Sequence, residues 1–158
     1  MEFKIGYGFQ NIKKDYIKVW GREIYDETKS LIDLNPNYLI TLFSHKEIIG
    51  WAVWHESDVM NNRKGYPRDT LDSEILIKLI GMKKEFIELH ELWIMEKFRG
   101  YKYGTQFFAF FEDFVKKQKF DSIIYYAEHK AAIEICRKRG YKELYNSELK
   151  WYTFYKLV

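Results

Sequence analysis

The sequence has little cysteine, no long apolar segment and little net charge, and each shortage excludes a class of protein. One cysteine, Cys136, excludes an internal disulfide and a cluster of thiolate metal ligands. We predict no metal. No apolar run approaches the roughly 18 residues of a membrane span, and no signal-peptide pattern opens the chain. We therefore expect a soluble, cytoplasmic protein without a membrane partner. The net charge of +3 is mild and predicts no nucleic-acid partner.

The residues that are present predict one globular domain over residues 1–158, because 47% of them are hydrophobic and can form a full core. Aromatic residues make up 19% of the chain. We assign most of them to the core or to strands, so their abundance alone indicates no ligand. No repeat, low-complexity tract or linker interrupts the chain.

The first third of the chain predicts a strand, a helical region and a hairpin. Residues 2–9 alternate in part, as in a strand, and residues 11–33 place apolar side chains at helical spacing. Gly21 falls in the middle, which leaves two helices or one kinked helix. Strands are expected at residues 38–43 and 48–55, where Gly50 marks a bulge or a close backbone approach.

The next segment, residues 56–85, predicts a polar loop at residues 58–68 and then a helix. The helix starts at Asp69 or Thr70 and stops at Gly81. Such a long connection inside a compact domain either covers a site or packs on the sheet edge, and the pattern leaves both open.

The remaining segments alternate strand and helix and end in a hairpin. Strands are expected at residues 88–95 and 122–127, helices after Gly104 and at residues 131–139, and the hairpin at residues 141–145 and 149–157. The fold class is therefore mixed α/β, with one extra helix between the third and fourth strands.

The stretch from Glu88 to Phe111, ELHELWIMEKFRGYKYGTQFFAFF, organises the rest of the chain. A strand leads into a basic, glycine-containing turn and then into an apolar helix. Backbone N–H groups and the positive end of the helix dipole face this turn, and Arg99 and Lys102 add charge. The stretch therefore predicts a site for a phosphate-bearing ligand, although an ordinary strand–turn–helix connection has the same pattern.

Two spaced motifs resemble those of the GNAT family of N-acetyltransferases. Its pyrophosphate loop, Arg/Gln-x-x-Gly-x-Gly/Ala, is matched by Arg99, Lys102 and Gly104, with lysine in place of the middle glycine. A second family segment, Asn-x-x-Ala-x-x-x-Tyr-x-x-x-Gly-Phe, is matched in spacing by His129, Ala132, Cys136, Gly140 and Tyr141. The run ELHELWIMEKFRG is similar to the polyamine and small-amine branch.

The resemblance implies a central, mostly antiparallel sheet flanked by helices, and acetyl-coenzyme A as the acetyl donor. Its implied donor-binding residues are Leu92, Trp93, Ile94, Arg99, Gly100, Tyr101, Lys102, Tyr103, Gly104, Thr105 and His129. Lys102 is irregular, because a non-glycine residue at positive φ costs on the order of 1 kcal/mol. Its ammonium either contacts a phosphate or points to solvent.

The family places a base on the fourth strand, where Glu88 and His90 share one face and Glu91 lies on the other. We expect His90 to be the base, because a free histidine pKa near 6.5 suits neutral pH, with Glu88 next. Cys136 stands where the family carries a tyrosine acid. Three interpretations stay open: a substitute acid, an apolar helix residue, or a thiol that pairs with the cofactor.

The implied function is transfer of acetyl from acetyl-coenzyme A to a primary amine of a small molecule or peptide by direct attack. The alternative is an acetyl-coenzyme A-binding sensor or regulatory module. Homodimers are usual in the family. The acceptor would be lined by Trp20, Glu23, Tyr25, Asp26 and Glu27, although a solvated helix face explains the acids equally well.

Overall fold

The computed structural model describes residues 1–82 and 85–158, and it divides the chain into two compact units. Unit 1 comprises residues 1–53 and 92–103, and unit 2 comprises residues 54–91 and 104–158. The end of the predicted 56–85 segment, residues 83 and 84, lies outside the described residues. Among the described helices, none combines the length and apolar character needed to cross a membrane.

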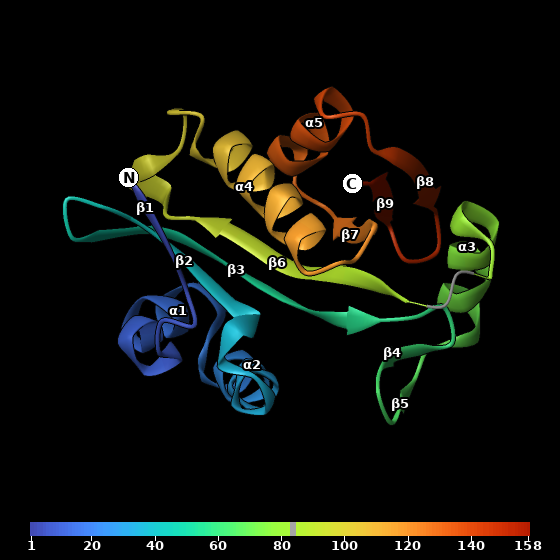
Figure 1. Ribbon diagram of the computed structural model, residues 1–158, viewed down its shortest axis with the longest axis horizontal. Helices are drawn as coiled ribbons and strands as arrows, with labels where there is room; N and C mark the ends of the chain where they lie inside the picture. The colour runs from blue at the N-terminus through green and yellow to red at the C-terminus, as the bar shows by residue number, and fades with distance from the viewer. Residues whose placement is uncertain (83–84) are drawn as a thin grey trace. The chain divides into compact units, whose positions relative to one another are not determined.

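Unit 1 begins with a short strand, two helices and a hairpin (Figure 1). Its elements are β1 (Glu2–Ile5), α1 (Lys13–Trp20), α2 (Arg22–Leu34), β2 (Leu39–Ser44) and the first part of β3 (Glu47–Ser57), with single 3₁₀ turns at Phe9–Ile12 and Pro36–Tyr38. It also holds the end of β6 (Phe86–Ile94) and a third 3₁₀ turn, Glu96–Phe98. The predicted first strand is too long, because Gly6 at φ 74° ends it and Phe9 turns into the core.

Gly21 decides between one kinked helix and two helices. Its φ of 89° lies outside the helical range, and its N–H bonds the carbonyl of Ile17 at 2.8 Å to close α1. The two-helix alternative is confirmed. Both helices contribute to one apolar cluster, in which Tyr16 and Tyr25 pack with Trp51 of β3.

The sequence left two roles open for Gly50 of β3, a bulge or a close backbone approach, and the structure shows both. A Cβ on this residue would lie 2.2 Å from the carbonyl oxygen of Trp93, so only glycine permits the approach of β6. The register with β2 also shifts between Leu42 and Phe43, as a bulge requires. Beside it, Met95 N–H bonds the carbonyl of Ile49 at 2.8 Å.

Unit 2 carries the rest of the sheet and three helices. Its elements are the end of β3, β4 (Asn61–Arg63), β5 (Tyr66–Pro67), α3 (Thr70–Ile80), the start of β6, α4 (Tyr103–Lys117, from Gly104 onward), β7 (Ser122–Ala127), α5 (Lys130–Lys138), β8 (Lys142–Asn146) and β9 (Trp151–Leu157). The apolar face of α4 is buried, and its Phe108 packs edge-on against Tyr125 of β7 at 5.6 Å.

The segment between β3 and β6 departs in part from the predicted polar loop. Asp58 folds it back by accepting the N–H groups of Met60 at 2.8 Å and Asn61 at 2.6 Å, and the hairpin β4–β5 follows. Asp69 caps α3 by accepting the N–H of Leu71 at 2.9 Å, which decides between the two predicted starts, and Gly81 ends the helix.

The strands follow the order β1-β2-β3-β6-β7-β9-β8, with β4 and β5 as a separate pair. The pairs β1–β2, β2–β3, β7–β9 and β8–β9 are antiparallel, whereas β6 and β7 pair in parallel. The prediction of a mixed, mostly antiparallel α/β sheet flanked by helices, with an extra helix before the fourth main strand, is confirmed. Leu76 of that helix is fully buried in a cluster with Ile124 and Tyr155, so the segment does pack on the sheet.

Candidate active site

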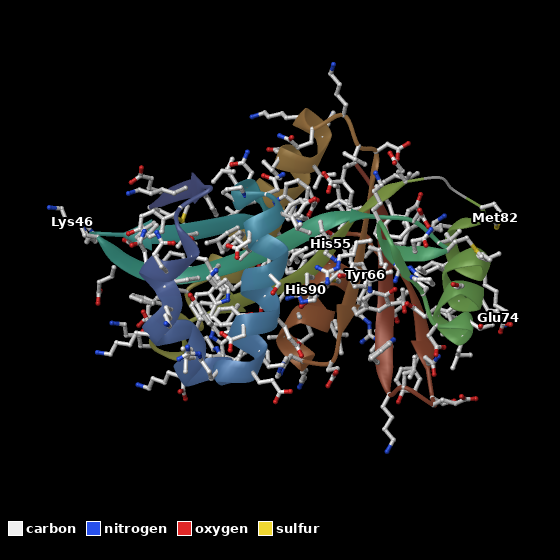
Figure 2. The ribbon with its side chains drawn as sticks, turned by 90° about the horizontal axis from the view of Figure 1, so that it is seen from below. Lys46, His55, Tyr66, Glu74, Met82 and His90 are labelled. Carbon is white, nitrogen blue, oxygen red and sulfur yellow. The ribbon has the colours of Figure 1, made fainter. Side chains whose placement is uncertain are left out.

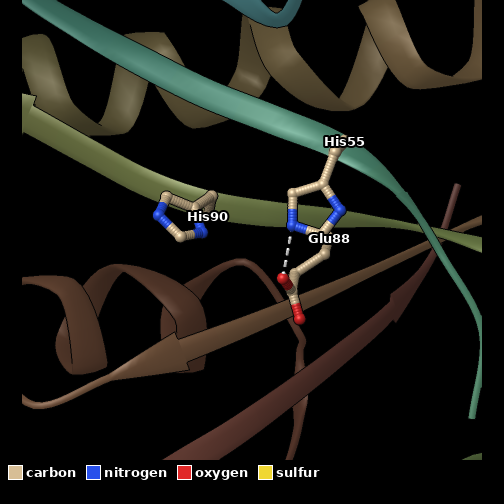
Figure 3. Close-up of side chains that lie close together, drawn as sticks. All are labelled: His55, Glu88 and His90. Carbon is tan, nitrogen blue, oxygen red and sulfur yellow. Dashed lines mark ion pairs between the residues drawn. The ribbon is translucent and has the colours of Figure 1, made fainter. Parts of the chain in front are cut away.

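One face of β6 in unit 2 carries Glu88 and His90, two residues apart as the period of a strand requires. His55, near the end of β3, reaches the same place (Figure 2, with a close-up in Figure 3). One ligand-type atom from each of these three side chains lies within 4.8 Å of the others. The predicted shared face of Glu88 and His90 is therefore confirmed.

His55 and Glu88 form a buried ion pair. His55 Nε2 lies 2.6 Å from Glu88 Oε2, and both side chains are at most 3% exposed. The other ring nitrogen, Nδ1, lies 3.0 Å from the backbone carbonyl of Glu56. A carbonyl and a carboxylate both accept hydrogen bonds, so both contacts are satisfied together only by the imidazolium form of His55.

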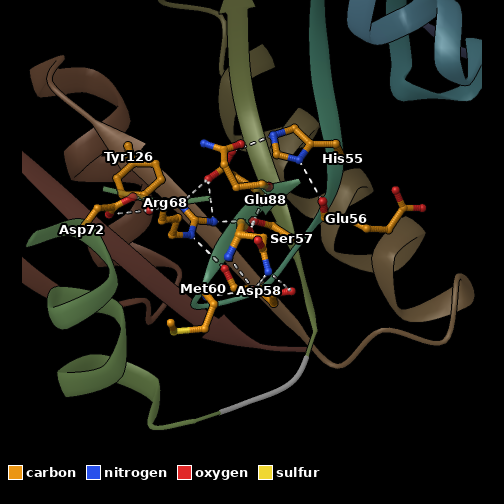
Figure 4. Close-up of polar contacts among 11 residues, drawn as sticks. His55, Glu56, Ser57, Asp58, Met60, Arg68, Asp72, Glu88 and Tyr126 are labelled. Atoms are coloured by element: carbon orange, nitrogen blue, oxygen red, sulfur yellow. Dashed lines mark hydrogen bonds and ion pairs between the residues drawn. The ribbon is translucent and has the colours of Figure 1, made fainter. Parts of the chain in front are cut away.

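Arg68, just after β5, holds the other Glu88 oxygen. Its Nη1 and Nη2 lie 3.4 and 3.3 Å from Glu88 Oε1. The same guanidinium donates to Asp72 Oδ2 at 2.9 Å, to Tyr126 Oη at 3.1 Å, to the carbonyl of Asp58 at 2.8 Å and to Ser57 Oγ (Figure 4). Five partners from four segments of the chain thus fix one buried cation.

These contacts keep Glu88 ionised. Burial favours the neutral acid and is the largest single influence, but the hydrogen bond and charge of His55, followed by Arg68, outweigh it and lower the pKa of Glu88. Arg68 is likewise desolvated, but Tyr126, Glu88 and Asp72 together raise its pKa. Glu88 is thus a carboxylate with both oxygens already bound.

His90 differs from Glu88 in access. Its ring reaches the surface, yet neighbouring atoms remove enough water that lost hydration is the main factor lowering the pKa of His90. The charges of His55 and Arg63 act in the same direction, and Glu88 opposes them. At neutral pH the imidazole is therefore neutral and able to accept a proton.

Two histidines and a carboxylate are also a set of ligands that divalent transition metals prefer. In this geometry His55 Nε2 and Glu88 Oε2 are bound to each other, and Arg68 places a positive charge on the second oxygen. Ion pairing alone accounts for the arrangement. The expectation of no metal stays a prediction.

The predicted phosphate-binding turn lies in unit 1 between β6 and α4. Gly100 and Lys102 both have positive φ, 85° and 65°, so the middle position of the motif does require the left-handed conformation. The residues from Arg99 to Lys102 are exposed. Arg99 turns back onto the strand, where its Nε donates to the carbonyl of Ile94 at 3.1 Å and its guanidinium lies 4.5 Å from the Trp93 ring.

The predicted donor-binding residues of the strand, Leu92, Trp93 and Ile94, are half-buried. The recorded pairing of β6 with β7 covers Ile87 to Leu89, and β6 continues beyond it to Ile94. Tyr103 opens α4, with Gly104 and Thr105 in its first turn. This first turn leaves backbone N–H groups outside the intrahelical ladder.

Cys136 is completely buried in α5. Burial, followed by the charges of Glu112 and Glu143, raises the pKa of its thiol to about 12. The interpretation as an apolar helix residue accommodates this environment best. His129 occupies the N-cap position of α5 without a capping hydrogen bond from its side chain, as expected for histidine.

One predicted acceptor-lining residue is wrong. Tyr25 is 3% exposed and stacks on Phe9 at 4.6 Å, so it belongs to the core. Trp20 is 36% exposed and meets Trp93 edge-on at 5.2 Å. The acids Glu23, Asp26 and Glu27 are exposed on α2.

Several residues of the network gave no functional signal in the sequence: His55, Ser57, Arg68, Asp72 and Tyr126. His55 and Ser57 continue the alternation that begins at Trp51 and Val53, so their shared face was readable. Arg68 was not, because it ends a polar segment and reaches Glu88 only through the fold.

Comparisons with known proteins agree with this architecture. The profile described as "Acetyltransferase (GNAT) family" matches residues 8–141. None of the curated proteins matches the sequence significantly. Similar solved structures include Ard1 from Thermoplasma volcanium (TM-score 0.67, 12% identity, 99% of this chain and 97% of that one) and a mosquito arylalkylamine N-acetyltransferase-like 5b (0.63, 14%, 86% and 81%). Drosophila melanogaster polyamine N-acetyltransferase is also similar (0.62, 9%, 85% and 80%).

Proposed function

Because the chain belongs to the Acetyltransferase (GNAT) family, and is therefore an acetyl-coenzyme A-dependent acyltransferase, we propose that it acetylates a primary amine of a small molecule or peptide. The observation that carries this proposal is His90, an accessible and neutral imidazole on β6. It stands two residues before the strand segment that the family uses for the donor. The solved arylalkylamine and polyamine N-acetyltransferases share the fold, and we extend their acceptor class, amines, to this chain.

The turn of unit 1 suits the anionic end of acetyl-coenzyme A. Two residues at positive φ open its backbone, and the N–H groups of Gly100 to Tyr103 would donate to a pyrophosphate, followed by those of Gly104 and Thr105. Lys102 would add its ammonium. The peptide groups of Leu92 to Ile94 would bond the pantetheine as an added strand, and His129 would contact it from the start of α5.

His90 would act as the general base. An amine with a pKa near 10.4 is mostly protonated at neutral pH, so a proton must leave before the nitrogen can attack. That first proton would pass to solvent. His90 would then accept a second proton from the attacking nitrogen as the nitrogen–carbon bond forms and the carbon–sulfur bond of the thioester breaks. A backbone N–H near Ile94 would stabilise the oxyanion. Both oxygens of Glu88 are already bound, so Glu88 would not take the proton itself. Its carboxylate would instead keep a negative charge beside His90.

The leaving group is a thiolate, which is stable enough to depart without strong acid assistance. Solvent would supply its proton, because burial raises the pKa of the Cys136 thiol to about 12 and makes it a weak acid. The complete burial of Cys136 supports a structural role, so Cys136→Ala is expected to lower kcat less than threefold, and Cys136→Tyr tests whether the usual acid accelerates turnover.

Thiol release from acetyl-coenzyme A, measured against amines, amino acids and peptides, tests the function. His90→Ala should lower kcat roughly 100-fold with unchanged donor affinity. His45→Asn is the matched control, because His45 is an exposed turn residue at φ 48° that asparagine tolerates. Stabilisation by the donor without turnover on any acceptor would indicate the sensor function instead, and absence of stabilisation would contradict both.

We further propose a cytoplasmic enzyme that consists of one domain and forms homodimers, as is usual in the family. Light scattering after size-exclusion chromatography tests the dimer: a mass near twice 19.3 kDa is expected, and a mass near 19.3 kDa would refute it.

A further inference from the structure

Arg63, at the end of β4, is held in one orientation by the hairpin. It faces Tyr66 of β5 in the strand register, and its guanidinium lies 4.3 Å from the centre of the Tyr66 ring. The side chain is half-buried as a result. A guanidinium stacked on an aromatic ring loses little further freedom when it binds a ligand.

Within the described part of the chain, Arg63 forms neither an ion pair nor a side-chain hydrogen bond, whereas the nearby Arg68 has five partners. Its fork of N–H donors is therefore available, and this fork matches a carboxylate in two parallel hydrogen bonds.

The root of the hairpin is fixed to the network around Glu88. Ser57 Oγ lies 3.1 Å from the carbonyl of Asn61 and 2.6 Å from that of Asn62, the residue before Arg63. Arg68 N–H bonds the carbonyl of Met60 at 2.9 Å on one side and its guanidinium binds Glu88 on the other. The hairpin that carries Arg63 is thus anchored beside the strand that carries His90.

The charge of Arg63 is also one of the influences that lower the pKa of His90, after lost hydration and the charge of His55. Of the other groups that act on His90, the Glu88 carboxylate is balanced by its ion pairs with His55 and Arg68. Arg63 is therefore a cation acting on His90 that has no ion-pair partner among the described residues, so a ligand can neutralise it.

We propose that Arg63 binds a carboxylate of the acceptor, so that the acceptors are amines that carry a carboxylate, such as amino acids or short peptides. This inference rests on the proposed acetyl transfer near His90. A polycationic amine would meet Arg63 with like charge and is disfavoured at this position.

Acceptor pairs that differ by one carboxylate test the assignment: L-arginine against agmatine, and L-phenylalanine against phenylethylamine. The wild-type enzyme should favour the carboxylate-bearing member at least tenfold in kcat/KM. Arg63→Met should bring this ratio close to one, mainly by lowering kcat/KM for the carboxylate-bearing member at least tenfold. Lys64→Met, which removes the adjacent exposed charge, is the matched control and should preserve the ratio.

The outcomes separate the two proposals. Turnover with equal or greater activity on the decarboxylated amines would refute the role of Arg63 and leave acetyl transfer intact. If no acceptor is turned over, calorimetry with L-arginine and agmatine decides for Arg63. Binding of L-arginine alone, lost in Arg63→Met, supports the site, and equal binding or no binding overturns it.

Discussion

The turn of unit 1 and the ionic network of unit 2 are two different kinds of charged site in one chain. The turn from Arg99 to Lys102 is exposed and relies on backbone conformation, with positive φ at Gly100 and Lys102. The network is buried and relies on side chains, with Glu88 bound by His55 and Arg68. The first kind of site depends on which residues permit a conformation, and the second on which residues meet after folding.

This difference predicts different failures. Removing a charge from the buried network leaves its partners desolvated and unpaired, which costs several kcal/mol. Removing a charge from the exposed turn alters ligand affinity but leaves no desolvated, unpaired partner, so the free energy of unfolding changes little. Replacing a tightly packed glycine by alanine should have an intermediate effect on the free energy of unfolding, because the effect depends on the space around the added Cβ.

The largest expected effect is that of Arg68→Met. Loss of the guanidinium leaves Glu88 and Asp72 without their shared cation and should lower the free energy of unfolding by about 3–5 kcal/mol. Urea denaturation measures it. The control is Arg22→Met, whose exposed pair with Asp26 should contribute at most about 0.5 kcal/mol. Equal effects of the two substitutions would mean that the buried network does not stabilise the fold.

The next largest effect on stability is expected for Gly50→Ala. Its Cβ would approach the carbonyl of Trp93 to 2.2 Å, and a backbone atom cannot move aside as a side chain can. The cost should be roughly 2–3 kcal/mol by urea denaturation. Gly8→Ala is the control, because the added carbon meets only the flexible end of Gln10. A tolerated Gly50→Ala would contradict the close approach of β3 and β6 in unit 1.

The pH dependence of stability sharpens the description of the network. The lowered pKa of Glu88 stabilises the folded state above the ordinary value of 4.5, and this contribution is lost as the pH falls through the lowered pKa. The free-energy difference between wild type and Glu88→Gln should therefore be full at pH 7 and shrink below about pH 4.5. A difference that persists undiminished to low pH would contradict an ionised, paired Glu88.

The smallest effect is expected in the turn. Lys102→Gly relieves the left-handed backbone and should raise the free energy of unfolding by at most about 1 kcal/mol. Lys102→Ala keeps the strain and also removes the charge. If the ammonium contacts a phosphate, both variants bind coenzyme A more weakly in calorimetry. Unchanged affinity in both would place the ammonium in solvent.

Much of the fold was readable in the sequence, because it depends on local signals. Gly21 marked a break or a kink in the helical region, Asp69 or Thr70 marked the start of α3 and Gly81 its end. The structure decides the open choices through a conformation or a side-chain contact within a few residues. The hairpin β4–β5 was not readable. Its short strands lie in a polar segment, and the Asp58 turn that closes it has no apolar periodicity.

The candidate site divides in the same way. Glu88 and His90 were placed on one face by strand period alone, and the need for positive φ at position 102 followed from the motif. His55, Arg68 and Tyr126 come from β3, the end of the β4–β5 hairpin and β7, and no local pattern joins them. Tyr25 failed for another reason: the family resemblance placed it in the acceptor lining, whereas tertiary packing buries it in the core.

The edge-on pair of Trp20 and Trp93 in unit 1 gives the protein a built-in optical reporter. Trp20 is partly exposed, and Arg99 of the turn lies over Trp93, so a ligand along Leu92 to Ile94 would alter the surroundings of both indoles. Trp51 and Trp54 are buried and would contribute a constant background. Donor binding should therefore be visible as a change in tryptophan emission, without a label and on the unmodified chain.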